Sequence, residues 1–165
     1  MLSTKPYNRT RAVQYARRWA FSRNPAYYDF SKLGGDCTNF ISQCIYAGAC
    51  QMNLTPTFGW YYLSPDNRAP SWSGVPFLYN FLTSNQGLGP FARDAGPEEM
   101  EPGDVIQLGS TQGEFYHSLL VTRVWGSRIL VATHTYDALD RPLSSYDYEV
   151  ARYLHLEGVR VPAQS

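Results

Sequence analysis

The first regular pattern along the chain is that of an amphipathic helix. From Asn8 to about Ser22, apolar side chains recur at helical spacing while arginines fill the opposite face. Asn8 is a favourable N-cap residue, and the pair Asn24-Pro25 ends the helix, because proline disfavours helical backbone at the residue before it. The apolar positions of this face are Ala12, Val13, Ala16, Trp19 and Ala20.

A second apolar stripe begins after the pair Gly34-Gly35 and ends near Gly48, a residue type favoured at helix C-termini. The pattern predicts a second helix with Asp36 at its start. The apolar positions that share one face of this helix are Phe40, Ile41, Cys44 and Ile45.

The rest of the chain changes from irregular structure to strands. Residues 51–103 are rich in turn-forming residue types and are predicted to be irregular, apart from a short helix at residues 75–83. Because such long loops are often functional, we expect this region to form a wall of a binding cleft. Apolar stretches then predict strands at residues 105–108, 116–124, 128–134 and 150–156. Helices followed by antiparallel strands predict an α+β fold.

Length and composition predict a single globular domain over residues 1–165, with a core from about residue 7 to residue 156. The chain has 165 residues, of which 44% are hydrophobic, enough for one core. Its 14 basic and 14 acidic side chains give a formal charge of zero, which disfavours nucleic acid or anionic lipid as partners. No apolar run approaches the roughly 18 residues of a membrane span, and residues 1–6 do not resemble a secretory signal. We expect a soluble monomer that functions in the cytosol or, as part of a longer or processed protein, in the cell envelope or outside the cell.

The spacing of cysteines and histidines argues against a disulfide framework and against a metal centre. The cysteines at positions 37, 44 and 50 are odd in number, so at least one thiol is free. Neither these cysteines nor the histidines at positions 117, 134 and 155 form the close ligand pairs of zinc sites. We therefore expect no metal and no cofactor.

Cys37 is the strongest candidate for a catalytic residue. The two glycines before it allow a sharp turn into the second helix, so that the thiol lies at a helix N-terminus. Unpaired N–H groups and the helix dipole favour a thiolate nucleophile there, and the same N–H groups can bind the oxyanion of an acyl-transfer intermediate. Cys37 also shares a helix face with Ile41 and Cys44, which directs it toward the strands. The alternative is an ordinary buried cysteine, the role that we assign to Cys44.

Two histidines in the strand region are candidates for a base and its orienting partner. His117 opens one predicted strand and His134 closes the next. With Gly126 and Ser127 as a two-residue hairpin loop, His134 lies opposite Leu119, which faces the same way as His117. The two histidines are then diagonal neighbours about 7 to 8 Å apart at Cα, within reach of a hydrogen bond between their imidazoles.

This arrangement depends on the strand register, because a shift of one residue puts the two histidines on opposite faces. Asp137, just past the second strand, is the competing orienting residue, and His134 would then be a histidine on the surface at a strand end. His155 has no comparable companions, so we take it as structural.

The ten residues Gly34–Gln43, GGDCTNFISQ, resemble the signature of the bacterial putative amidase domain family. The resemblance spans about residues 7–156 and includes Trp60-Tyr61-Tyr62, Ser71-Trp72, Gly103–Gln107, His117-Ser118 and His134-Thr135. That family is similar to the NlpC-like cell-wall cysteine peptidases, which implies a papain-like fold with an Asp-Cys motif at a helix start. The resemblance further implies Cys37 as the nucleophile, His117 as the base and His134 as the third residue. The separation of 17 residues between the two histidines is longer than in typical relatives.

The reaction implied by the resemblance is hydrolysis of an amide or peptide bond through a thioester, with the peptidoglycan stem peptide as the expected substrate. Candidate substrate-binding residues are Asp36, Tyr28, Trp60 and Trp72. The tryptophans belong either to a platform for sugar rings or peptide, or to the core, and Asp36 alternatively supports the helix start. Relatives often place a tyrosine upstream of the cysteine to help the oxyanion, and Tyr27 and Tyr28 are the candidates here.

Two other functions fit the same residues. A deamidase or acyltransferase would use Cys37 and His117 with a different acceptor. A wall-binding module without catalysis would use the aromatic cluster of Trp60, Tyr61, Tyr62 and Trp72, a reading that the intact Cys37 and His117 disfavour.

Overall fold

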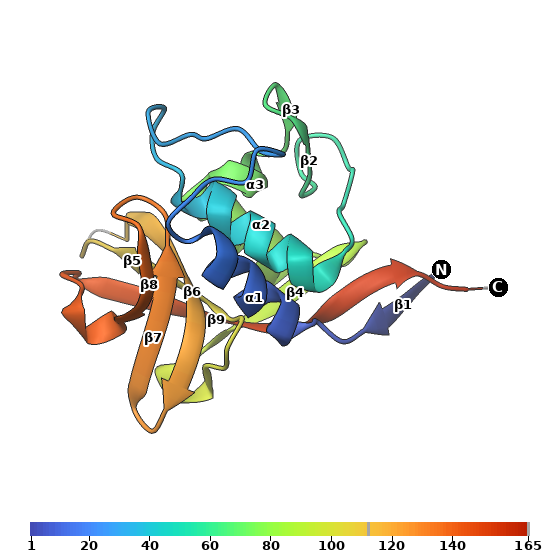
Figure 1. Cartoon of the computed structure of the whole chain (residues 1–165). Coiled ribbons are helices and arrows are strands. Elements are labelled where there is room, and N and C mark those ends of the chain that lie inside the picture. Colours follow the sequence, from blue (N-terminus) through green and yellow to red (C-terminus); the bar gives the residue numbers. More distant parts are fainter. Residues whose placement is uncertain (112, 165) are drawn as a thin grey trace.

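The structure, a computed structural model, describes residues 1–111 and 113–164 and has an α+β architecture (Figure 1). The helices are α1 (Arg9–Trp19), α2 (Cys37–Ala49), α3 (Pro70–Ser73) and α4 (Val75–Ser84). The strands are β1 (Leu2–Lys5), β2 (Tyr62–Ser64), β3 (Asn67–Arg68), β4 (Gly89–Ala95), β5 (Val105–Gly109), β6 (Phe115–Trp125), β7 (Arg128–Thr133), β8 (Ala138–Pro142) and β9 (Val150–Pro162). Single turns of 3₁₀ helix occur at Pro97–Glu99 and Leu143–Ser145. Among the described residues, no helix combines the length and apolar character needed to cross a membrane.

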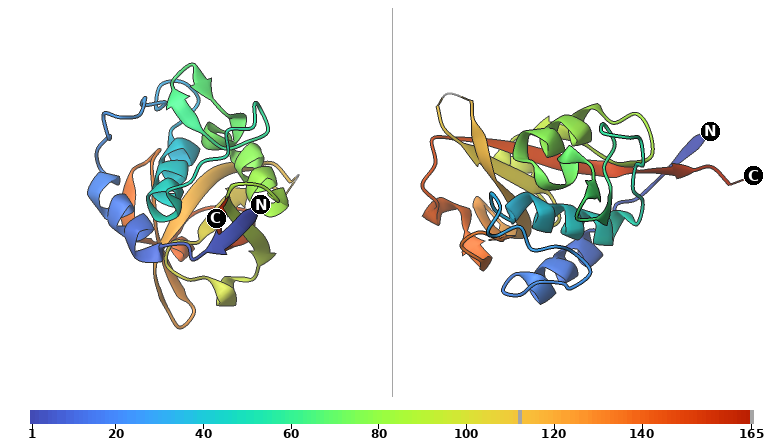
Figure 2. Two further views of the ribbon diagram at one scale, coloured as in Figure 1. Left: turned by 90° about the vertical axis from the view of Figure 1, so that its right-hand side faces the viewer. Right: turned by 90° about the horizontal axis from the view of Figure 1, so that it is seen from above.

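Seven strands form one antiparallel sheet, in which the long C-terminal strand β9 pairs with the N-terminal strand β1. The strand order is β1-β9-β5-β6-β7-β8, and β4 pairs along the other edge of β9. β2 and β3 form a separate small ribbon. β1 and the last residues of β9 extend together from the body of the molecule, so the two termini lie side by side (Figure 2).

Helices α1 and α2 lie side by side on one face of the sheet (Figures 1 and 2). The Asn8 side chain accepts a hydrogen bond from the backbone N–H of Arg11, which confirms the predicted N-cap of α1. Ala12 and Ala16 of α1 have no exposed surface, and such small side chains allow α1 to approach α2 closely. Both helices were predicted to within a few residues of their ends.

The sheet is apolar on both faces. Leu120 in β6 packs with Phe40 and the rest of the helix layer, whereas its neighbours Leu119 and Val121 pack with Ile106 in a second cluster on the opposite face. The central strands are therefore nearly continuous apolar runs, as expected for strands that are buried on both sides.

The strands that the hydrophobic pattern did not predict are the short or polar ones. β1 and β8 lie at the ends of the strand order, and β4 carries a proline and charged residues. Edge strands bury only part of their side chains, so their sequences lack the apolar alternation that identifies a strand.

The hairpin of β6 and β7 contains a bulge that sets the position of the candidate site. Trp125 pairs with Arg128 across the two-residue loop, as predicted. The register then shifts at Thr122, so that Val121 pairs with Val131 and the predicted pairing is wrong beyond this point.

Candidate active site

Cys37 is the first residue of α2 and lies between the helix start and strand β6. Gly34 and Gly35 have φ angles of 93° and 107°, in the region that only glycine adopts readily, and they form the predicted sharp turn. The Cys37 side chain is 8% exposed, and its Sγ lies 3.8 Å from the Thr38 hydroxyl and within hydrogen-bonding range of the Ser118 backbone. The thiol is thus directed toward the sheet, next to the residue that follows His117.

The acidity of this thiol differs from the prediction. Burial raises the pKa of Cys37, and this effect outweighs the lowering by hydrogen bonds from the Ser118 and Thr38 backbones and the Thr38 side chain. The predicted thiolate is therefore wrong for the free domain, because desolvation dominates over the helix N-terminus. At neutral pH the Cys37 side chain is therefore a neutral thiol.

His117 lies on β6 opposite Leu108, close to the strand start. Its Nε2 is 3.5 Å from the hydroxyl oxygen of Thr133 on the neighbouring strand. Burial lowers the pKa of His117 to about 4, with a smaller contribution from the positive charge of Arg141. At neutral pH the imidazole is therefore uncharged and able to accept a proton.

His134 lies on the other face of the sheet and does not orient His117. His134 was expected on the same face of the sheet as His117. The bulge at Thr122 shifts the register by one residue, which places Thr133 rather than His134 on the face of His117. His134 is 1% exposed, stacks on Phe40 with ring centroids 3.9 Å apart, and its Nε2 lies 2.8 Å from the carbonyl oxygen of Trp19. The prediction that the two histidines are diagonal neighbours is wrong.

The partner of His134 is Asp36, the residue immediately before the candidate nucleophile. The His134 Nδ1 and an Asp36 carboxylate oxygen are 2.6 Å apart, and both side chains are buried. The other carboxylate oxygen accepts hydrogen bonds from the Phe30 backbone N–H and the Asn39 side-chain amide. With 1% exposure, Asp36 cannot contact substrate, which contradicts its assignment as a binding residue. Its role is to fix the chain at the start of α2.

Because Asp36 is engaged in this way, its side chain makes no capping hydrogen bond to α2. The first N–H groups of any α-helix lack acceptors within the helix, and here the first helical hydrogen bond is donated by Phe40 to the Asp36 carbonyl. The N–H of Cys37 thus has no acceptor within the helix.

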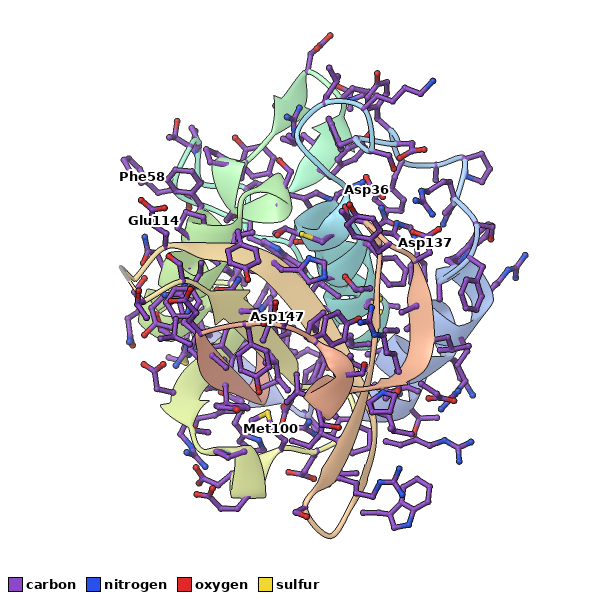
Figure 3. All side chains as sticks on the ribbon, turned by 90° about the vertical axis from the view of Figure 1, so that its left-hand side faces the viewer. Asp36, Phe58, Met100, Glu114, Asp137 and Asp147 are labelled. Atoms are coloured by element: carbon purple, nitrogen blue, oxygen red, sulfur yellow. The ribbon has the colours of Figure 1, made fainter. Side chains whose placement is uncertain are left out.

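Asp137, the alternative orienting residue, forms an ion pair with Arg23 instead. Both terminal nitrogens of Arg23 donate to the Asp137 carboxylate, at 3.0 and 3.1 Å, and its Nε lies 3.3 Å from Asp29 and 3.7 Å from Asp36. Figure 3 shows Asp36 and Asp137 near one another at the end of the sheet where α2 begins. This cluster supports the helix start on the side away from His117.

A cavity of about 520 Å³ adjoins His117, large enough for a short peptide segment. Its rim includes Thr135 and Tyr136 of the turn between β7 and β8, which have φ angles of 65° and 56° although neither is glycine. The Thr135 hydroxyl accepts a hydrogen bond from the backbone N–H of Asp36, so the rim of the cavity is tied to the start of α2. The other lining residues are Leu108, Tyr116, Arg141, Tyr146 and Asp147.

The predicted tryptophan platform lies inside the protein. Trp60 and Trp72 have no exposed surface, and their indole N–H groups donate to Ser42 and Asn39. Their burial contradicts the prediction that they bind substrate, and residues 51–103 supply none of the lining of the cavity beside His117. Tyr28 is 44% exposed and stays a candidate for binding substrate.

Tyr27 is partly buried and stacks on Trp72, with ring centroids 6.0 Å apart. It therefore belongs to the core of the helix layer.

Thr133, Arg141 and Tyr136 are the lining or neighbouring residues that the sequence reasoning missed. Nothing in their local pattern marks them, since their position depends on the bulge and the β7–β8 turn.

His155 belongs to a separate buried cluster around Asp104. Its Nδ1 lies 2.9 Å from the Asp104 carboxylate, which is also bound by Arg9 at 2.7 Å. The carboxylate accepts backbone N–H groups of Glu101 and Leu156 as well. These contacts join α1 to β9 and support the structural role expected for His155.

Comparisons with known proteins are consistent with an amidase. The family described as "Putative amidase domain" matches residues 6–156. A protein of Bacillus subtilis (strain 168) described as "Uncharacterized protein YhbB" is 35% identical over 144 residues, which cover 86% of this chain and 45% of that protein. The chain thus spans less than half the length of this relative, and no solved structure matches it. The match over most of its length shows that the chain belongs to the putative amidase domain family, which indicates hydrolysis of an amide bond.

Proposed function

We propose that this domain is a cysteine-dependent amidase of papain-like fold, with Cys37 as nucleophile and His117 as general base. One observation carries the proposal: a buried thiol at a helix N-terminus lies against the backbone of Ser118, the residue that follows an uncharged histidine lining a cavity. A thiol, a base and nearby N–H donors are the components of acyl transfer through a thioester.

The resting pair is neutral, so proton transfer accompanies the attack. His117 takes the thiol proton as Cys37 Sγ bonds to the amide carbon, and the carbonyl oxygen becomes an oxyanion close to the N–H of Cys37. The proton then passes from His117 to the leaving nitrogen, which departs as an amine. A water molecule, deprotonated by His117, hydrolyses the thioester and releases a carboxylic acid and the thiol.

Two neighbouring residues have positioning roles in this mechanism. We assign the Thr133 hydroxyl, 3.5 Å from His117 Nε2, the role of orienting the imidazole ring. His134 acts on the opposite face: by holding Asp36, it fixes the backbone from which the Cys37 N–H projects. We therefore assign the third site of the triad to Thr133 and a supporting role to His134.

The substrate that we propose is an amide or peptide bond of peptidoglycan. This part of the proposal is supported by the resemblance of the Gly34–Gln43 block to the putative amidase domain family, a family that is similar to NlpC-like cell-wall peptidases. The alternative of a wall-binding module is weakened, because Trp60 and Trp72, the centre of its aromatic cluster, have no exposed surface. A deamidase or acyltransferase would use the same pair, and only its acceptor differs.

The test combines turnover with thiol reactivity. Release of free amine from purified peptidoglycan is measured by mass spectrometry for the parent and for Cys37→Ala, His117→Ala and the matched control Cys50→Ala. We expect loss of turnover in the first two variants only, since Cys50 is exposed and lies at the far end of α2. Undiminished amine release by Cys37→Ala contradicts the mechanism, and release only in the presence of a second amine acceptor favours an acyltransferase.

Iodoacetamide distinguishes the neutral pair from a preformed thiolate. Since burial raises the pKa of Cys37, the exposed Cys50 is expected to be alkylated faster at pH 7 in the absence of substrate. Fast alkylation of Cys37 well below the ordinary thiol pKa of about 8.5 would instead indicate a preformed thiolate.

A further inference from the structure

The guanidinium of Arg141 is held in a fixed orientation beside the base. Its Nε donates to the Ser145 hydroxyl at 2.8 Å and its Nη2 to the Ser145 carbonyl at 3.2 Å. The guanidinium carbon also lies 3.8 Å above the centre of the Tyr146 ring. These contacts restrict the side chain without neutralising its charge, which is the preorganised state that favours recognition of an anion.

The Tyr146 ring connects this arginine to the catalytic base. The centres of the Tyr146 and His117 rings are 6.1 Å apart, so the guanidinium carbon, 3.8 Å from the Tyr146 centre, lies within about 10 Å of the His117 ring. Arg141 and His117 line the same cavity. An extended peptide advances about 3.3 to 3.6 Å per residue, so a group bound at Arg141 belongs to the first few residues from the bond at the base.

Arg141 is one of the arginines that form no ion pair with a carboxylate among the described residues. Arg9 and Arg17 form ion pairs at 2.7 and 2.8 Å with Asp104 and Asp140. Within the part of the chain that the structure describes, no carboxylate lies within 4.0 Å of Arg141, although Asp147 lines the same cavity and is exposed to solvent. Nη1 makes no hydrogen bond within the described part of the chain, and Arg141 lines the cavity, so this nitrogen is left to bind a ligand.

We propose that Arg141 is a specificity-determining residue that binds a carboxylate of the substrate, within three residues of the amide bond that is cut. The inference rests on the proposed amidase function and names its substrate class: acidic peptides with a free carboxylate near the scissile bond. A guanidinium forms charge-assisted hydrogen bonds with a carboxylate and loses them when the carboxylate becomes a neutral amide. The exposed ring of Tyr136, at the rim of the cavity, provides apolar surface for the peptide between the two groups.

The experiment compares two matched substrates. One is a set of soluble stem-peptide fragments with free carboxylates, and the other is the same fragments after conversion of the carboxylates to primary amides. A hydrogen bond to a charged group is worth about 1.5 to 3 kcal/mol, so we expect the parent to prefer the acidic fragments by about 10- to 150-fold in kcat/KM. Arg141→Gln is expected to remove this preference by slowing only the acidic fragments, whereas Arg141→Lys, which keeps the charge but not the fork, retains part of it.

Arg128→Gln is the matched control, since Arg128 lies at the far end of β7 over the Trp125 ring. It is expected to leave both rates unchanged. Equal kcat/KM for the two substrates in the parent, or an unchanged preference in Arg141→Gln, overturns the carboxylate site while the amidase mechanism stands.

Binding separates this proposal from the amidase function itself. If the parent cleaves neither substrate, the Kd of the acidic fragments is measured by calorimetry for Cys37→Ala and for Cys37→Ala with Arg141→Gln. A tenfold or greater weakening in the second protein supports the carboxylate site even though the catalytic proposal has failed. Equal Kd values in the two proteins overturn it.

Discussion

Replacement of His134 by alanine tests whether the residue supports the start of α2 or belongs to the catalytic triad. The change removes the group that lies 2.6 Å from the Asp36 carboxylate, and it removes the ring stacked on Phe40. Asp36 keeps its hydrogen bonds from Phe30 and Asn39, but its remaining basic neighbour is Arg23, 3.7 Å away. The variant therefore contains a buried carboxylate without its closest partner.

The expected loss of stability is large. Removal of the closest hydrogen-bond partner of a buried carboxylate costs about 3 kcal/mol or more, and the retained hydrogen bonds of Asp36 place the value at about 3 kcal/mol. In a domain of this size, that corresponds to a decrease in Tm of about 6 to 12 °C. In an Asp36→Asn background, His134→Ala is expected to cost about 2 kcal/mol less, because the buried charge is already absent.

Urea unfolding followed by tryptophan fluorescence measures these free energies, and His155→Ala is the matched control. Asp104 keeps Arg9 at 2.7 Å when His155 is lost, so the control is expected to cost only about 1 kcal/mol. A cost below about 1 kcal/mol for His134→Ala, equal in both backgrounds, would refute the anchoring role. If the folded variant also lost about a thousandfold in kcat/KM, His134 would instead be part of the triad.

Three further predictions concern the base, its neighbour and the rim of the cavity. Because the pKa of His117 is about 4 when folded and about 6.5 when unfolded, kcat/KM is expected to be level from pH 5 to 8 and to fall near pH 4. Between about pH 6.5 and pH 4 the unfolded chain binds more protons at this position than the folded protein, so the free energy of unfolding decreases as the pH falls through this range. His117→Gln is expected to remove this contribution. A fall in kcat/KM near pH 6.5 would contradict the lowered pKa on which both expectations depend. Thr133→Val removes the hydroxyl near His117 Nε2 and is expected to lower kcat about tenfold with little change in KM, and unchanged kcat would exclude a positioning role. Tyr136→Gly relieves a positive φ angle of 56°, so it is expected to change stability by less than about 1 kcal/mol while raising KM, and a strongly destabilised variant would show that Tyr136 has a structural role.

The sequence predicted the elements whose identity depends on local pattern. α1, α2 and the central strands have clear apolar periodicity, and the Gly34-Gly35 turn requires the residue type found there. The bulge at Thr122 has no such signature. The Thr122 hydroxyl donates to Asp140 at 2.8 Å, and Asp140 is in turn paired with Arg17 of α1, so the register of the hairpin is set by contacts between distant segments.

That bulge explains why the site was predicted only in part. Cys37 and His117 lie where helix and strand beginnings placed them, whereas the histidine on the next strand moved to the opposite face through a shift of one residue. The acidity of the thiol was also missed, because desolvation depends on packing against Ser118 and is not visible in the spacing of residues. The starts of α2 and β6 were predictable from the sequence, whereas the relation between the strands and the burial of the thiol were not.

The ribbon formed by β1 and the end of β9 determines how the domain responds to mechanical tension. The four residue pairs run from Leu2 opposite Pro162 to Lys5 opposite Val159, so both chain ends lie at the same end of the ribbon. A force that pulls these ends apart therefore separates the pairs one at a time, starting from the termini. Such a geometry yields at low force, because each step breaks only the outermost hydrogen bonds. β9 remains held by β4 and β5 after β1 has detached, so tension transmitted along a longer polypeptide would be dissipated in the ribbon before it reached Cys37.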